Sequence, residues 1–241
     1  MTAKLRERSN RRCAGLALPW QMVSSNYYES LWDALPEGRH PSDLKLRLAF
    51  LLEHARSAQD SGGAPGGGTP GRVLDVGCGE GHFAAELARA GLQVIGVDVA
   101  EEPLRRARVK HPDLDLRVVP AEGSWPLTDA SFDIVWAGET IEHVADTAGW
   151  LSEVRRVLRS AGTLLLSTPA HGRLAMLALA VSHRRFDAHF DPRSDHLRFY
   201  ASRTLARLLE DFGFEDIHVR KAGGLPGARR LLLASARRSR F

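Results

Sequence analysis

The stretch RVLDVGCGEGHF, residues 72–83, decides the fold of this chain. Its first residues are mostly apolar and β-branched around one acid, Asp75, which predicts a buried strand. Three alternate glycines follow, and their lack of a Cβ permits both a tight turn and the close approach of a ligand to bare backbone. A helical pattern comes next. A strand that passes through glycines into a helix is typical of the ligand-binding loop of an α/β sheet.

The spacing of these glycines separates two kinds of cofactor site. A dinucleotide-binding fingerprint needs a small residue at position 82, where this chain has a histidine. The pattern Asp-x-Gly-x-Gly-x-Gly at 75–81 instead resembles the first motif of class I S-adenosylmethionine-dependent methyltransferases. In that family the loop packs against the amino-acid end of the cofactor. The resemblance therefore implies cofactor contacts from Asp75, Gly77, Cys78, Gly79 and Gly81.

An acid after the next predicted strand supports this cofactor. Asp98 follows the apolar segment 93–97 and lies about twenty residues after the first glycine, where a carboxylate can accept both hydroxyls of a ribose. The competing interpretation is that Asp98 caps a helix beginning at residue 101. The resemblance implies further cofactor contacts from Val99, from Glu122 at the adenine amino group, and from Gly138 and Glu139.

From residue 72 onward, predicted strands alternate with predicted helices. Strands are expected at 72–76, 93–97, 116–120, 132–137 and 163–167, and helices at 81–90, 101–110, 145–158 and 202–212. This alternation predicts an α/β fold with a Rossmann-like, doubly wound, mostly parallel sheet and helices on both faces. In class I methyltransferases two further strands, here near 217–220 and 231–236, form a C-terminal antiparallel hairpin. The resemblance thus implies a sheet of seven strands.

The remaining segments are expected to surround this domain, which spans 72–241. Residues 1–60 are predicted to be an N-terminal helical cap and substrate region, with a helix at 44–56 where leucines recur at helical spacing. Residues 61–71 are rich in glycine and proline and predict a flexible linker. The stretch 169–201 is longer than a plain connection, which favours a lid or binding loop.

Composition sets broad limits on the class of protein. The 241 residues, 44% of them hydrophobic, can bury one sizeable core. The net charge of +4 comes partly from arginine clusters near both ends, which are usually solvated, so no nucleic-acid partner is required. Only two cysteines occur, Cys13 and Cys78, and no disulfide is expected. There is no signal-like segment and no apolar run long enough to span a bilayer, so a soluble, cytoplasmic protein is predicted. The sequence does not indicate its oligomeric state.

A Glu-x-x-Glu-His run after the fourth predicted strand carries the candidate chemistry. If Glu139, Glu142 and His143 begin a helix, positions i, i+3 and i+4 place them on one face. One interpretation is that the acids only favour a helix N-terminus electrostatically. A second makes His143, beside Glu142, a catalytic general base, for which an imidazole pKa of about 6.5 is suited. A third is a site for Mg²⁺ or a similar ion.

The run is similar to one that binds a divalent metal in ubiquinone-biosynthesis O-methyltransferases and in small-RNA 3′-terminal 2′-O-methyltransferases. That resemblance implies a metal site at Glu139, Glu142 and His143, with a fourth ligand from His196 or His189. The same run also occurs in relatives for which no metal is known. The base and the metal interpretations therefore both stay open.

Together these features predict a methyltransferase that transfers a methyl group from S-adenosylmethionine to a small-molecule acceptor. A hydroxyl needs deprotonation more than an amine does, so the Glu/His run favours O-methylation. The alternatives are N-methylation of a small molecule, 2′-O-methylation of a terminal RNA ribose, and cofactor binding without catalysis. RNA binding would be tight and salt-dependent. The sequence does not identify the acceptor.

Overall fold

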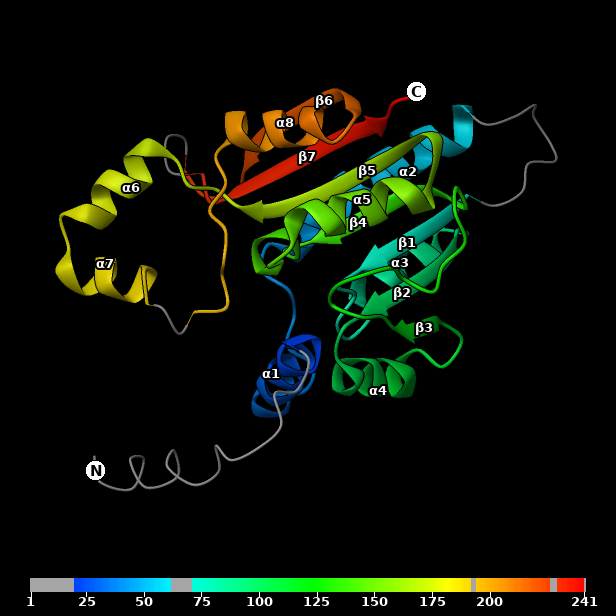
Figure 1. Ribbon diagram of the computed structural model, residues 1–241, viewed down its shortest axis with the longest axis horizontal. Helices are drawn as coiled ribbons and strands as arrows, with labels where there is room; N and C mark the ends of the chain where they lie inside the picture. Colours follow the sequence, from blue (N-terminus) through cyan, green and yellow to red (C-terminus); the bar gives the residue numbers. More distant parts are fainter. Residues whose placement is uncertain (1–19, 62–70, 192–193, 226–228, 241) are drawn as a thin grey trace.

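The computed structural model describes residues 20–61, 71–191, 194–225 and 229–240, without the side chains of 20–25 and 57–61. Its centre is a sheet in the order β3-β2-β1-β4-β5-β7-β6 (Figure 1). The strands are β1 (Arg72–Val76), β2 (Gln93–Asp98), β3 (Asp115–Val118), β4 (Phe132–Gly138), β5 (Leu158–Pro169), β6 (Phe214–Ala222) and β7 (Leu231–Arg238). The first five are parallel, and β7 runs antiparallel to both β5 and β6. The predicted seven-stranded fold with its C-terminal hairpin is confirmed.

The glycine loop begins at the centre of this sheet. Strand β1 pairs with β2 on one side and with β4 on the other, so that Val73 lies opposite both Val94 and Ile134. Both faces of β1 are covered, because Val73 and Leu74 are buried in two different hydrophobic clusters. A strand buried on both faces reads as a nearly continuous apolar run, as this one does.

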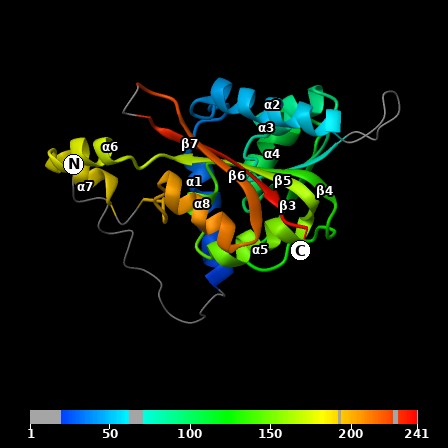
Figure 2. The ribbon, with the colours of Figure 1, turned by 90° about the horizontal axis from the view of Figure 1, so that it is seen from above.

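Helices cover both faces of the sheet, as predicted for a doubly wound fold. Helices α2 (Leu44–Ser61) and α3 (His82–Arg89) pack on one face, and α5 (Thr147–Val157) and α8 (Ser202–Asp211) on the other (Figure 2). Helix α4 (Glu101–Lys110) packs Leu104 and Ala107 against Cys78 of the glycine loop. Helix α2 extends to Ser61, and residues 62–70, the body of the predicted linker, lie outside the described residues.

The N-terminal segment divides into two differently placed helices. Helix α2 belongs to the core, since Phe50, Leu51 and Ala55 are buried with β1 and α3. Helix α1 (Trp20–Ala34) instead lies over the carboxyl ends of the strands, near α4 (Figure 1). The exposed stretch 35–43 connects the two.

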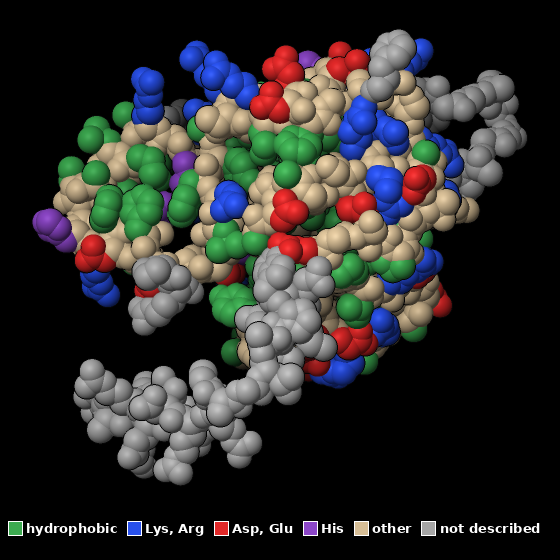
Figure 3. Space-filling view, in the orientation of Figure 1, with side chains coloured by type: hydrophobic (Ala, Val, Ile, Leu, Met, Phe, Trp, Pro, Cys, Tyr) green, Lys and Arg blue, Asp and Glu red, His purple; other side chains and the backbone are tan. Residues whose placement is uncertain are grey.

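The insertion after β5 forms a helical pair that projects from the sheet. Helices α6 (Arg173–Ala180) and α7 (His183–His189) contain no buried residue, and α7 was not predicted. Leu174, Leu177 and Val181 are exposed, and Figure 3 shows hydrophobic side chains gathered on this lobe. Among the described helices, none is both long enough and apolar enough to cross a bilayer.

Candidate active site

A cavity of about 900 Å³ lies between α1 and the carboxyl ends of the central strands. Parallel sheets bind ligands at this end, beside the point where the strand order reverses. The cavity is lined by nearly all of the predicted site residues: Asp75, Gly77, Cys78, Gly79, Asp98, Val99, Glu122, Gly138, Glu139, Glu142, His143 and His196. Gly81 is outside this lining, because it caps α3 and faces Leu114 and His111.

The glycine loop needs its glycines for conformation and for space. Gly77, Gly79 and Gly81 all have left-handed φ angles, of 70°, 52° and 77°. A Cβ on Gly77 would lie 2.6 Å from the hydroxyl oxygen of Thr140, which is too close. The loop is also tied to β2, since the N–H groups of residues 77 and 78 both donate to the carbonyl of Val97. The backbone that faces the cavity is therefore fixed in place.

Asp98 is buried and directed at the glycine loop. Its Oδ2 accepts from the N–H of Gly79 at 3.0 Å, and its Oδ1 from the N–H of Ala100 at 3.1 Å. Burial raises the pKa of this carboxyl above its usual range. The first N–H groups of α4 donate to Glu29 of α1, which takes the helix-capping role that the sequence left open for Asp98. With a third backbone donor at Val99, the carboxylate keeps the capacity to accept about one further hydrogen bond from a ligand.

Arg47 of α2 is a site residue that the sequence reasoning missed. The residue is 2% exposed and lines the cavity. Its guanidinium donates to the carbonyl of Ser42 at 3.2 Å and lies 4.8 Å from the centre of the Phe83 ring. A Cβ on Gly138 would overlap it, so glycine there is what admits the arginine. Burial lowers its pKa, against the attraction of Glu139 and other acids. The available signal was an arginine on the leucine-rich face of the predicted helix.

Two acids accompany Arg47, Asp75 buried and Glu139 partly buried. Asp75 has one oxygen, Oδ2, with no partner among the described residues, and burial raises its pKa to about 7. Glu139 accepts from the hydroxyl of Ser167 at 3.1 Å, and burial raises its pKa as well. A buried cation beside two such carboxylates can bind the two ends of an amino-acid group, its carboxylate and its ammonium.

The Glu-x-x-Glu-His run does not form the predicted helical turn. The helical part of the run is a single 3₁₀ turn, η1 (Ile141–His143). Glu139 lies before this turn and has a φ of 57°, in the left-handed region. Glu139 therefore does not share a helical face with Glu142 and His143, although its charge is close enough to raise the pKa of Glu142. The potential metal ligands that lie together among the described residues are Glu142, His143 and His196, with ligand atoms within 4.8 Å of one another.

His143 is held by the insertion after β5. Its Nδ1 lies 2.9 Å from the carbonyl oxygen of Asp195 and 3.5 Å from that residue's carboxylate. A carbonyl only accepts, so Nδ1 carries the proton and Nε2 carries the lone pair. Burial lowers the pKa of His143, although Asp195 opposes the shift. The imidazole is therefore neutral near pH 7 and able to accept a proton.

Glu142 is buried beside this histidine. Its Oε2 accepts from Thr168 at 3.0 Å, whereas its Oε1 has no partner among the described residues. Burial, and next the charge of Glu139, raise its pKa to about 8. His189 does not join this group, because its ring packs on His171 and Phe199 in the insertion.

The fold and the cavity define the class: a Rossmann-like α/β domain with its site at the ends of parallel strands, as in class I methyltransferases. The chain belongs to the methyltransferase domain family, whose model matches residues 42–219.

Two sequence relatives illustrate this family. Identity is 38% over 143 residues to a probable S-adenosylmethionine-dependent methyltransferase of Mycolicibacterium smegmatis, covering 59% of this chain and 51% of that protein. It is 28% over 211 residues to the ubiquinone biosynthesis O-methyltransferase of Burkholderia pseudomallei, covering 85% and 86%. The chain spans about half the length of the first of these curated relatives.

Solved structures agree on the fold. An S-adenosylmethionine-dependent methyltransferase from Mesorhizobium loti superposes with a TM-score of 0.58 at 23% identity, covering 78% of this chain and 98% of that one. The CurJ carbon methyltransferase gives a TM-score of 0.63 at 15% identity, covering 90% and 58%.

Proposed function

We propose that this protein transfers a methyl group from S-adenosylmethionine to a hydroxyl group of a small molecule. The family supports the donor. The observation that carries the hydroxyl acceptor is His143, a neutral imidazole in the cavity wall whose tautomer is set by the carbonyl of Asp195. A hydroxyl must lose its proton to accept a methyl group, and such an imidazole can take it.

The donor is bound by groups along the whole cavity. Asp98 accepts the ribose hydroxyls, and Glu122 contacts the adenine. At the other end, Arg47 binds the carboxylate of the methionine part, while Asp75 and Glu139 face its ammonium group. These assignments are supported by the burial of Arg47 and by the unpartnered oxygen of Asp75, since buried charges in proteins are normally paired.

The chemistry asks little of the protein beyond alignment and proton removal. The donor carries a methyl group already activated by a positively charged sulfur. The acceptor oxygen forms the new bond to this carbon as the carbon–sulfur bond breaks, and the bonding electrons stay on sulfur. The hydroxyl proton passes to Nε2 of His143. Holding the oxygen and the methyl carbon in line contributes most of the rate.

A divalent cation fits the same cluster as an alternative to the imidazole base, since Nε2 of His143 would then bind the ion and not take the proton. Glu142, His143 and His196 would hold it, and the unpartnered Oε1 of Glu142 is the buried oxygen that such an ion would satisfy. Two imidazoles and one carboxylate suit manganese, iron or zinc better than Mg²⁺, which prefers oxygen ligands. A bound ion of this kind lowers the pKa of the hydroxyl that it contacts.

The test combines calorimetry with labelled-methyl transfer. S-adenosylmethionine is expected to bind the wild-type protein and to bind Asp98→Ala at least about tenfold more weakly, because a buried hydrogen-bonded carboxylate is lost. Transfer of labelled methyl is then measured to a panel of phenols, sugars, amines and short RNAs. Label on oxygen of a small molecule supports the proposal. Label on nitrogen or RNA, or none with any acceptor, contradicts it.

A further inference from the structure

Helix α1 lies over the cavity, and its described side chains are at most partly buried. None of the described side chains of α1, residues 26–34, is buried, although Tyr28 and Trp32 line the cavity. Hydrophobic stabilisation grows with the apolar area that is removed from water, so these described side chains contribute modestly to docking. Polar contacts therefore account for much of the attachment of residues 26–34.

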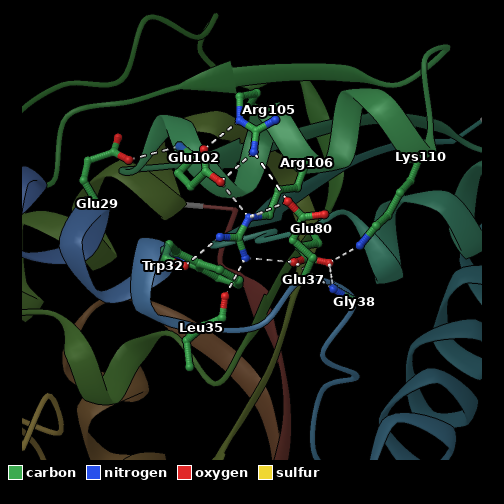
Figure 4. Close-up of polar contacts among 10 residues, drawn as sticks. All are labelled: Glu29, Trp32, Leu35, Glu37, Gly38, Glu80, Glu102, Arg105, Arg106 and Lys110. Atoms are coloured by element: carbon green, nitrogen blue, oxygen red, sulfur yellow. Dashed lines mark hydrogen bonds and ion pairs between the residues drawn. The ribbon is translucent and has the colours of Figure 1, made fainter.

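Arg106 of α4 binds the C-terminal end of α1. Its side chain is 5% exposed, and it donates to the carbonyls of Trp32 at 2.9 Å and Leu35 at 3.0 Å (Figure 4). The last carbonyls of a helix lack partners within it and carry partial negative charge, so a guanidinium is favoured there. In the reverse direction, Glu29 of α1 accepts from the first N–H groups of α4, those of Glu101 and Glu102. The two helices thus cap each other.

Glu80 joins these contacts to the glycine loop. Its side chain is 1% exposed and lies 3.5 Å from Arg106, and it also pairs with Lys110 (Figure 4). Both of its oxygens accept from the N–H of Gly38, just beyond α1, at 3.0 and 3.2 Å. Burial opposes its ionisation, yet the hydrogen bonds from Lys110 and Gly38 outweigh burial and lower its pKa.

The contacts of α1 inside the cavity define what this attachment positions. The Trp32 ring lies so close to Gly79 that a Cβ there would be 3.2 Å away. The Tyr28 hydroxyl donates to the carbonyl of His143 at 3.3 Å. One face of α1 thereby touches both the loop assigned to the donor and the run assigned to the acceptor proton. The connection 35–43 has no buried residue, and Gly38 and Asp43 have positive φ angles of 75° and 48°.

We propose that α1 is a lid over the donor pocket and that Arg106, with Glu80, is the positioning pair that holds it closed. The connection 35–43 serves as its hinge, and separation of α1 from Arg106 admits the donor and releases its demethylated product. The inference rests on the proposed function in one respect, that this cavity holds the donor.

The decisive variant is Arg106→Met, which removes the guanidinium hydrogen bonds to the carbonyls of Trp32 and Leu35 and keeps an unbranched side chain. Arg105→Met is its matched control, because Arg105 is exposed on the same helix and pairs with Glu102 and Glu37. Two rates are measured: release of S-adenosylhomocysteine by stopped flow, and chymotryptic cleavage within α1. In Arg106→Met both rates are expected to rise about tenfold or more. In Arg105→Met both stay at the wild-type values.

Further variants separate the lid from general destabilisation. Glu29→Gln keeps an acceptor but removes the charge at the N-terminus of α4, and release is expected to rise about twofold to fivefold. Leu209→Ala opens a cavity in α8, far from the lid, and should leave release unchanged. The lid is refuted if Leu209→Ala speeds release as much as Arg106→Met does. It is also refuted if neither Arg106→Met nor Glu29→Gln changes the rate of release. Should Arg106→Met not fold, Glu29→Gln decides.

Binding of the donor to the wild-type protein is measured first by calorimetry. A wild-type protein that binds neither S-adenosylmethionine nor S-adenosylhomocysteine refutes the proposed function. Normal binding together with unchanged release in the lid variants refutes the lid alone.

Discussion

Replacement of Arg47 by methionine should weaken donor binding without weakening the fold. Arg47 is 2% exposed, the Nε of its guanidinium has no partner among the described residues, and the group contacts the Ser42 carbonyl and the rings of Phe83 and Trp136. Removing a charge from water opposes folding unless a partner compensates for it. Methionine is apolar and of similar length, so the free energy of unfolding of Arg47→Met should be unchanged or higher.

Donor affinity should fall steeply in the same variant. Truncating one member of a buried, hydrogen-bonded charge pair costs about 2–5 kcal/mol, and the burial of Arg47 puts its pair with the donor carboxylate in that class. The Kd should rise by a factor of about 30 to several thousand. Isothermal calorimetry measures the affinity, and thermal unfolding without ligand measures stability. Arg56→Met, exposed on the same helix, is the control.

The reasoning is refuted by a folded Arg47→Met protein whose Kd for S-adenosylmethionine stays within about threefold of the wild-type value. A large loss of stability in the ligand-free variant would refute the other half, since it would mean that the guanidinium serves the fold.

Three further predictions concern the glycine loop and the acids. Gly77→Ala should lose about 2 kcal/mol more stability in urea than Gly91→Ala, because both have positive φ but only the first would overlap Thr140. Burial raises the pKa of Asp75 to about 7, so its neutral carboxyl group favours the folded state at low pH. This contribution to the free energy of unfolding is at most about 4 kcal/mol; it is complete below about pH 4 and is lost as the pH rises to 7. In Asp75→Asn the pH dependence of ligand-free unfolding should flatten by that amount, and an unaltered slope would contradict the shift. If an ion occupies the cluster of Glu142, His143 and His196, EDTA should abolish methyl transfer and Mn²⁺ should restore it better than Mg²⁺. The Glu142→Ala variant should not respond to added metal. Turnover that is indifferent to chelation would leave only the imidazole base.

The sequence predicted those features that depend on local pattern. Strand β1 and helix α4 have the predicted bounds, because an apolar run and a helical repeat decide them within a few residues. Strand β5 begins at Leu158, five residues earlier than expected, since its first part is polar and is held by pairing with Phe132. The left-handed backbone conformation of Glu139 was not predicted either, because the surrounding structure imposes a positive φ on a bulky residue.

The lid contacts and Arg47 could not be predicted for a different reason. Arg106 binds carbonyls more than 70 positions away in the chain, and Tyr28 reaches the carbonyl of His143 across 115 positions. Backbone carbonyls carry no sequence signal, so nothing in the residue types marks these pairs. The cavity could be located from its strand ends and a cap expected within residues 1–60, but the contacts that attach α1 could not be predicted.

The position of β7 has a consequence for how the protein is made. This strand follows β5 and β6 along the chain, yet it lies between them and pairs with both, so that Thr163 meets Arg237. During synthesis, the edge of β5 stays open until residues 231–238 have left the ribosome. Pairing over such a separation is slow, and an open apolar edge invites association with other chains. The nascent polypeptide should therefore be most dependent on chaperones just before residues 231–238 emerge.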